Sequence, residues 1–306
     1  MSPAAYHPVF TPPPNPNVKI WRYMDFAKYV SLLIQGALWF SRIDRLQLED
    51  RFEGSSSRLN LTILRSELEK FDLPRTEIER LTRPPEVSTR SHENSYVNCW
   101  HMNQRESAAM WKLYARSGDA IAVQSTYSRL HASLPDKADI RQVVPANIEY
   151  HNPGQTEIGV DEHGNKIVMR IAEVYLGTIH YIDYDVEPMI PGHWPDGSPI
   201  PLTQFPDLVP LKYKRKSFEH EKELRAIIWN MPLLESGEDE NKYGPRLVPN
   251  LAAGQIVRLS LDDLIENVYV APTAPPYFHK VVASVTSLYG LEREPIRSSL
   301  ADDPLQ

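Results

Sequence analysis

A short charged segment, KRKSFEHEKELR at residues 214–225, sets acids and bases at two-residue spacing just before the apolar run 226–229. Residues two apart in a strand lie on one face, so Glu221, Glu223 and Arg225 would share a face and their apolar neighbours would point the other way. A carboxylate pair held beside a cation could stabilise a developing positive charge or accept a proton. The alternative is a solvated strand face on which Arg225 neutralises its neighbours. The sequence leaves both interpretations open.

Two further acids and a lysine extend this candidate site. Asp50 and Glu53 follow a predicted strand, where they could cap the next helix or hold a basic partner such as Arg22 or Arg225. Lys214 could anchor a phosphate or pair with Glu53. We therefore treat Asp50, Glu53, Lys214 and Arg225 as one set, either substrate-binding residues or a structural ion network.

Several kinds of catalytic site are not indicated. The chain has no GxSxG, GxxxxGK[ST], GxGxxG or HExxH motif. Its lone Cys99 rules out an internal disulfide and a cysteine-based zinc site. A metal site built from His220, Glu221 and Glu223 is conceivable, but hydrogen-bonded surface residues are the commoner outcome, and we assign no metal ligands.

Composition favours a globular protein without a membrane span. The 306 residues are 42% hydrophobic and 24% charged, and no apolar run reaches membrane-spanning length. The N-terminus lacks the pattern of a secretory signal, so we expect a cytoplasmic protein. With 33 basic and 40 acidic residues the net charge is −7, which argues against nucleic acid as a partner but leaves a local basic patch open.

The order of the predicted elements indicates one α+β domain over residues 18–300, with a mixed, mainly antiparallel sheet flanked by helices. Residues 1–17 are Pro-rich and form a tail or an arm lying over the fold, residues 55–90 form a helical insertion, and residues 301–306 form a C-terminal tail.

The elements that would position the site come in three groups. The first is a strand at 19–24, a helix at 26–35 with Asp25 as N-cap and Gly36 as left-handed C-cap, and a strand at 37–41. The others are a strand at 96–101, a helix at 107–116 and a strand at 120–124; strands at 146–150 and 166–171 around a hairpin; and a strand, helix and strand at 267–270, 277–289 and 295–297.

Four segments, in this order, resemble a bacterial family known as domain of unknown function 2971. They are residues 21–41 with a "L-x-F-S" strand, EDRFE at 49–53 where the family usually reads N-D-P-F-E, residues 99–115 with an "MW-x-x-YA" helix, and "K…F-x-x-E-x-E-x-R" from Lys214 to Arg225. The resemblance covers most of residues 18–298. Glu49 and Arg51 depart from the family pattern, and membership implies no established activity.

The layout is also similar to that of ADP-ribosyltransferases, in which a basic strand residue, a Ser-containing strand and an E-x-E glutamate embrace nicotinamide adenine dinucleotide (NAD). That similarity implies NAD as cofactor or substrate, with Arg22 contacting the dinucleotide, Ser41 bracing the site and Tyr23 or Trp39 stacking on nicotinamide. The implied catalytic residues are Glu223, which would stabilise the oxocarbenium-like ribose, and Glu221, which would orient the acceptor. This makes an NAD-dependent ADP-ribosyltransferase or NAD glycohydrolase the leading hypothesis.

Two other functions stay open. A metal-dependent nuclease or phosphodiesterase would use Asp50, Glu53, Glu221 and Glu223 as oxygen ligands, with Lys214 on the phosphate. A non-enzymatic sensor or interaction protein would bind through the Pro-rich loops and the insertion. Architectural similarity does not by itself fix a function, and a role in phage defence is likewise only a suggestion.

Overall fold

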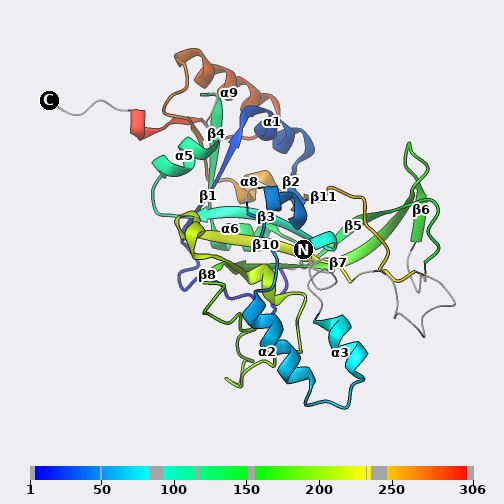
Figure 1. Cartoon of the computed structure of the whole chain (residues 1–306). Helices are drawn as coiled ribbons and strands as arrows, with labels where there is room; N and C mark the ends of the chain where they lie inside the picture. Colours follow the sequence, from blue (N-terminus) through cyan, green and yellow to red (C-terminus); the bar gives the residue numbers. More distant parts are fainter. Residues whose placement is uncertain are drawn as a thin grey trace.

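A large mixed sheet runs through the computed structural model, which describes residues 4–48, 50–82, 92–114, 118–150, 156–231, 233–235 and 247–301 (Figure 1). Its strands, together with the separate pair β8 and β9, are β1 (Lys19–Asp25), β2 (Ala37–Arg42), β3 (Ser95–Met102), β4 (Ala120–Thr126), β5 (Lys137–Val144), β6 (Thr156–Val160), β7 (Lys166–Thr178), β8 (His180–Ile182), β9 (Tyr213–Arg215), β10 (Glu223–Trp229), β11 (Gly254–Arg258), β12 (Asn267–Val270) and β13 (Ile296–Arg297). Within the described residues the main sheet has 11 strands in the order β13-β12-β4-β1-β3-β10-β7-β5, with β2 on β3, β11 on β2 and β6 on β7.

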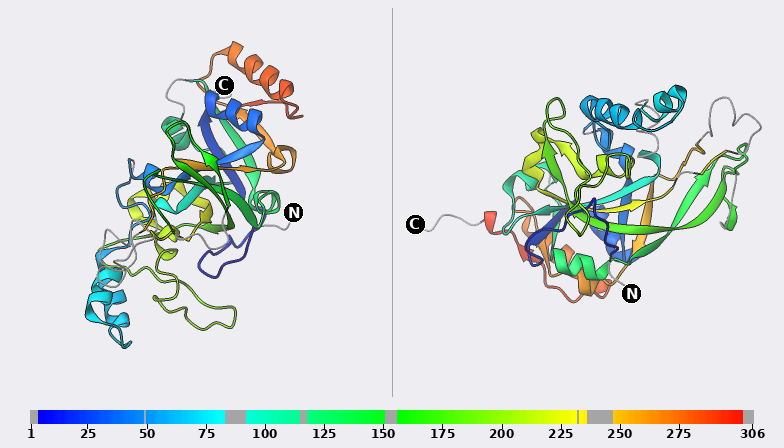
Figure 2. Two further views of the ribbon diagram at one scale, coloured as in Figure 1. Left: turned by 90° about the vertical axis from the view of Figure 1, so that its right-hand side faces the viewer. Right: turned by 90° about the horizontal axis from the view of Figure 1, so that it is seen from below.

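Helices flank this sheet, which confirms the predicted α+β class. They are α1 (Phe26–Gln35), α2 (Arg58–Leu68), α3 (Arg75–Leu81), α5 (Ala108–Tyr114), α6 (Tyr127–Ser133), α8 (Leu261–Leu264) and α9 (Pro276–Leu288), with 3₁₀ helices η1 (Ile43–Leu48), η2 (Val209–Lys212), η3 (Lys216–Glu221) and η4 (Ser299–Ala301). Figures 1 and 2 show α1 and α9 at one end of the molecule and the insertion helices α2 and α3 at the other. No helix among the described residues is long and apolar enough to cross a membrane.

The opening unit β1-α1-β2 forms as its sequence predicts. The Asp25 carboxylate accepts a hydrogen bond of 2.8 Å from the backbone N–H of Lys28, which satisfies an orphan donor at the start of α1. Gly36 ends the helix at φ 53° and ψ 42°, a left-handed conformation that a side chain would disfavour. The chain therefore reverses directly from α1 into β2.

The sheet divides between β1 and β2. On one edge of β3, His101 and Met102 pair with β1, while Tyr96 and Val97 pair with β2. In the described pairing, the three residues between them, 98–100, are matched with neither strand on that edge. The helix α1 connects the two diverging strands. Because neither strand pairs with residues 98–100, the sheet has a gap beside the middle of β3.

The charged segment enters β10 with its two faces separated as predicted. Leu224, Ala226 and Ile228 lie in the main hydrophobic core, and Glu223 and Arg225 lie on the opposite face. The hypothesis of a solvated face is wrong, because Glu223 is 4% and Arg225 0% exposed. Because both charged side chains are buried, each needs an oppositely charged partner inside the protein.

Glu221 is not on the strand. It ends the 3₁₀ helix η3, and Lys222 follows in a left-handed conformation at φ 42° before β10 begins. The strict two-residue alternation therefore fails at this position, because the chain turns between Glu221 and Glu223.

The middle of the chain also differs from its prediction. The strand that forms the hairpin with β7 is β6 (Thr156–Val160). The strand predicted at residues 146–150 does not form a regular strand. The strands β5 and β11 were not predicted. In the first part of β5, exposed Lys137, Asp139 and Arg141 alternate with buried Ala138 and Ile140, a period-two signal that could have identified the strand.

The N-terminal segment lies against the sheet. Val9 and Phe10 are buried, Phe10 stacks on Tyr175 of β7 at 5.5 Å between ring centroids, and Ala5 makes an isolated β-bridge with the same tyrosine. Residues 4–17 are therefore an arm over the fold. Parts of the predicted tails and insertion, at 1–3, 83–91 and 302–306, lie outside the described residues.

Candidate functional site

A cavity of about 510 Å³ occupies the gap between β1 and β2, a size typical of small-molecule sites. All four residues predicted to bind the dinucleotide line it, and they come from the two diverging strands. These residues are Arg22, Tyr23, Trp39 and Ser41. The divergence of the sheet thus creates the space and brings these side chains to it.

The predicted acids line the same cavity from another side. Asp50, Glu53, Lys214, Glu221 and Glu223 all contribute to its lining, whereas Arg225 supports them from beneath. Nine of the ten predicted site residues therefore line one cavity. They come from β1, β2, the turn after η1, β9, η3 and β10, segments that are far apart in the chain.

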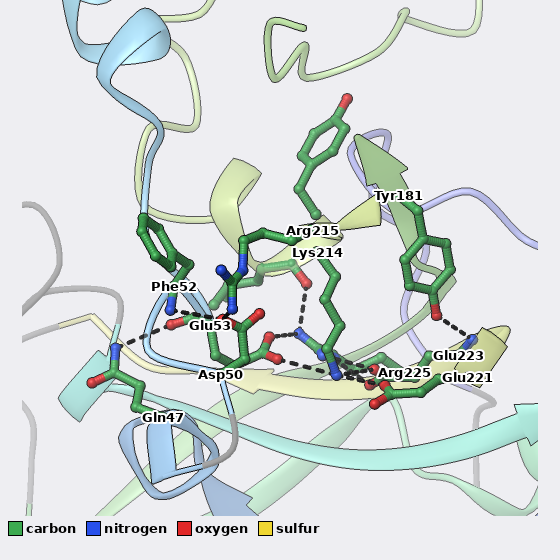
Figure 3. Close-up of polar contacts among 12 residues, drawn as sticks. Gln47, Asp50, Phe52, Glu53, Tyr181, Lys214, Arg215, Glu221, Glu223 and Arg225 are labelled. Atoms are coloured by element: carbon green, nitrogen blue, oxygen red, sulfur yellow. Dashed lines mark hydrogen bonds and ion pairs between the residues drawn. The ribbon is translucent and has the colours of Figure 1, made fainter. Parts of the chain in front are cut away.

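Arg225 is the centre of the ion network beneath the cavity (Figure 3). It binds Glu223 with two hydrogen bonds, Nε to Oε1 at 2.7 Å and Nη2 to Oε2 at 3.0 Å, and its Nη1 donates to Glu53 Oε1 at 2.9 Å. This two-pronged geometry is the strong form of an arginine–carboxylate pair. Burial alone would lower the pKa of Arg225, but the two carboxylates outweigh it and raise that pKa.

Lys214 joins a third carboxylate to the network. Its Nζ lies 2.5 Å from Glu221 Oε2, 3.4 Å from Glu53 Oε2 and 3.6 Å from Glu223 Oε2. Three carboxylates against two cations leave one negative charge in excess when all are ionised. We call Glu53, Lys214, Glu221, Glu223 and Arg225 the floor network.

The two glutamates of the E-x-E motif have opposite protonation tendencies. Burial would raise the pKa of Glu223, but the charges of Arg225 and Lys214 hold it below its usual value. For Glu221, burial and the nearby Glu223 outweigh Lys214 and raise the pKa. Glu223 is therefore the more firmly ionised of the two carboxylates, and Glu221 is the more easily protonated.

Asp50 pairs with Arg215, a partner that was not predicted. Its Oδ1 accepts from Arg215 Nη2 at 2.6 Å and from the backbone N–H of Phe52 at 3.0 Å. Asp50 therefore braces the turn that carries Glu53, and does not cap a helix or bind Arg22. The predicted pairing of Glu53 with Arg225 is confirmed.

The two aromatic candidates differ in how much of the ring is open. Tyr23 is 5% exposed, its hydroxyl accepts from the backbone N–H of Ser107 at 2.9 Å, and its ring packs edge-on against Trp111 at 4.9 Å. Trp39 is 45% exposed and donates its indole N–H to Ser41 Oγ at 3.1 Å. Trp39 is thus the better stacking surface of the two, and Tyr23 shapes the wall behind it.

Three buried polar atoms at the cavity lack a hydrogen-bond partner within the described part of the chain. They are Arg22 Nη1, His101 Nε2 and Asp50 Oδ2, each from a residue that lines the cavity. Buried polar groups are nearly always satisfied, so unpaired ones facing a cavity indicate where water or a ligand binds. We call these three the unpaired wall atoms.

Two cavity residues, His101 and Cys99, escaped the sequence prediction. Both lie on β3, two residues apart, and both line the cavity. The alternation of Val97, Cys99 and His101 on one strand face was the signal that could have found them. Burial first, and then Glu223, raises the pKa of the Cys99 thiol, which makes it a poor nucleophile.

The floor offers no ligand set for a metal ion. Among the residues that the structure describes, no group of three or more His, Cys, Asp or Glu side chains is placed to hold one. The carboxylates of the floor network are directed at Lys214 and Arg225 instead. This geometry gives the metal-dependent hypothesis no support.

Comparison with family models, with curated proteins and with solved structures finds no match to this chain.

Proposed function

We propose that this protein cleaves the nicotinamide–ribose bond of NAD, as an ADP-ribosyltransferase-like enzyme or an NAD glycohydrolase. One observation carries the proposal: a single cavity joins Arg22, Trp39 and Ser41 of the divided sheet to the acidic floor that contains Glu221 and Glu223. The proposal also draws on the resemblance of the sequence to the domain of unknown function 2971 family and to the ADP-ribosyltransferase layout.

The charges and surfaces of the cavity suit the parts of this substrate. Arg22 Nη1, which has no partner in the described ranges of the chain, can donate to a phosphate oxygen of the pyrophosphate. The open ring of Trp39 can stack on a planar base, and the excess negative charge of the floor favours the cationic nicotinamide ring. An anion-binding side and a cation-binding side in one cavity are what a dinucleotide with both features requires.

Bond cleavage leaves a positive charge on the ribose. As the bond between C1′ and the ring nitrogen breaks, its electron pair goes to nicotinamide, which leaves as a neutral molecule, and the ribose takes oxocarbenium character. Glu223 would stabilise that charge because Arg225 and Lys214 keep its carboxylate ionised and fixed. Glu221 would orient the acceptor, either water or a hydroxyl or amine of a target, which forms the new bond to C1′ and loses a proton.

The test measures nicotinamide release from NAD by chromatography. The wild type should release nicotinamide, and Glu223→Gln should reduce the rate by roughly 100-fold or more, the usual effect of removing one transition-state electrostatic contact. The matched control is Glu219→Gln, an exposed glutamate in the same segment, which should keep the wild-type rate. Circular dichroism should show that Glu223→Gln retains its fold.

Two outcomes would overturn the proposal. The first is a wild type that releases no nicotinamide at any concentration of NAD or acceptor protein, which would favour a non-enzymatic sensor if NAD still binds. The second is cleavage of nucleic acid with Mg²⁺ or Mn²⁺ and without NAD turnover, which would favour the nuclease hypothesis.

A further inference from the structure

His101 is held at the cavity with one ring nitrogen engaged and the other unused. The residue is 4% exposed and lines the cavity from the end of β3, where its backbone is in register with Trp21 of β1 and Glu223 of β10. Nδ1 lies 2.6 Å from the backbone carbonyl oxygen of Glu221. Nε2 is buried and has no hydrogen-bond partner among the described residues.

The engaged nitrogen fixes the tautomer of the ring. A carbonyl oxygen can only accept a hydrogen bond, so Nδ1 carries the hydrogen. In the neutral imidazole Nε2 then has a free lone pair and can only accept. Burial lowers the pKa of His101, and Lys222 adds to this effect while the hydrogen bond to the Glu221 carbonyl opposes it, so the site favours the neutral ring.

We propose that His101 is the general base of the reaction: its Nε2 takes the proton from the acceptor that attacks the ribose. This inference rests on the proposed function, because it assigns the proton step of NAD cleavage. The acceptor oxygen forms its bond to C1′ and passes its hydrogen to Nε2, while nicotinamide leaves with the electron pair of the broken bond. The imidazolium then returns that proton to solvent.

The contacts favour His101 over Glu221 for this step. Glu221 Oε2 already binds Lys214 at 2.5 Å, whereas Nε2 of His101 has no partner among the described residues. His101 is hydrogen-bonded to the backbone carbonyl of Glu221. This contact holds the proposed base close to the residue whose carboxylate would orient the acceptor. The charged and titratable groups around the ring are Tyr23 from β1, Glu223 in register on β10, and His220, Glu221 and Lys222 from the segment before β10.

Two variants test the role. His101→Asn keeps a side-chain donor for the Glu221 carbonyl and removes Nε2, so it should fold normally and lose about 100-fold or more in kcat for nicotinamide release. His101→Ala should lose as much activity and regain at least tenfold on addition of free imidazole. Both should bind ADP-ribose within about threefold of the wild type, because a base for the attacking group contributes little to binding.

The control is His163→Ala, an exposed histidine of the β6–β7 hairpin, whose rate should match the wild type with or without imidazole. If the wild type releases nicotinamide and His101→Asn does so at the same rate, the role of His101 is overturned and the proposed function survives. If imidazole fails to restore any activity to a folded His101→Ala, the role is likewise overturned. A wild type without turnover overturns both proposals.

Discussion

The floor network and the unpaired wall atoms lie at the same cavity but differ in whether their polar groups have partners within the protein. On the floor, Glu53 and Glu223 bind Arg225, and Lys214 binds Glu221. On the wall, Arg22 Nη1, His101 Nε2 and Asp50 Oδ2 have no partner within the described residues. The comparison separates charges that the protein satisfies by itself from polar atoms that require something else.

The difference follows from position in the sheet. The floor network centres on Glu223 and Arg225 of β10, a central strand paired on both sides, where both side chains are buried and an unpaired charge would be very costly. The unpaired wall atoms come from β1, the end of β3 and the turn after η1, around the gap between β1 and β2, where no described residue forms a hydrogen bond with them. We infer that the floor holds a fixed electrostatic field and that the wall supplies the contacts to a ligand.

The largest effect should come from removing the centre of the floor. Arg225→Met retains an unbranched stem but removes the hydrogen-bonded cation of Glu53 and Glu223, which leaves these buried carboxylates only Lys214 at 3.4 and 3.6 Å. The free energy of unfolding in urea should fall by about 3–5 kcal/mol, the usual result of breaking a buried pair on one side. A fall below about 1 kcal/mol would mean that the two carboxylates can be satisfied without Arg225.

The next effect separates stability from binding. Arg22→Met should change the free energy of unfolding by less than about 0.5 kcal/mol, because Nη1 makes no hydrogen bond to any described residue that the variant would lose. Its affinity for ADP-ribose, measured by calorimetry, should fall by about 1.5–3 kcal/mol, the range for a hydrogen bond to a charged group. Equal losses of stability and affinity would show that Arg22 stabilises the fold as the floor network does, and the distinction between floor and wall would fail.

Much of this arrangement follows from the sequence. The capping residues Asp25 and Gly36, the strands that carry Arg22 and Ser41, and the inward face of Glu223 and Arg225 are set by local patterns of charge and apolar residues. Such patterns are short-range, so one sequence carries them. The contact of Glu53 with Arg225 is long-range, and the sequence offered it only as one of several alternatives, beside a helix cap and a pair with Arg22.

The sequence could not predict features that depend on tertiary pairing. The pattern of β3 does not reveal that its edge is shared between two strands, and that division makes the cavity and brings His101 to it. Glu221 was placed on the strand because the alternation of charges continues through it, whereas the left-handed Lys222 interrupts the strand. A backbone turn of this kind leaves no mark on charge spacing.

A smaller effect should appear on acidification. The pKa of Glu223 is lower in the folded protein than its ordinary value of 4.5, so below about pH 5 the unfolded chain binds this proton first. Stability from Glu223 is thus fully present above that range and is lost as pH falls towards the lower folded pKa. Each unit of depression corresponds to about 1.4 kcal/mol, and the fall in unfolding free energy between pH 6 and pH 3.5 should be at least about 1 kcal/mol.

The variant Glu223→Gln isolates this contribution. It lacks the titrating group, so its stability should change less with pH than that of the wild type over the same interval. Glu221, whose pKa is raised partly by Glu223, acts in the opposite direction, and the variant removes that part, so the difference between the two proteins is a lower bound on the contribution of Glu223. Parallel curves for the two proteins would contradict the low pKa of Glu223.

The smallest effect concerns an ion pair of the same chemistry at the surface. Glu67 and Lys70 on and beside α2 are 2.6 Å apart, with side chains 40% and 65% exposed. Glu67→Gln should lower the free energy of unfolding by no more than about 0.5 kcal/mol, and 1 M salt should abolish even that difference.

The same exchange at Glu53, which is 1% exposed and faces both Arg225 and Lys214, should cost several times as much and resist salt. Urea titrations of the two variants at low and high salt measure this ratio. Equal costs would show that burial does not distinguish the floor network from the protein surface, and the contrast with the wall atoms would then lose its physical basis.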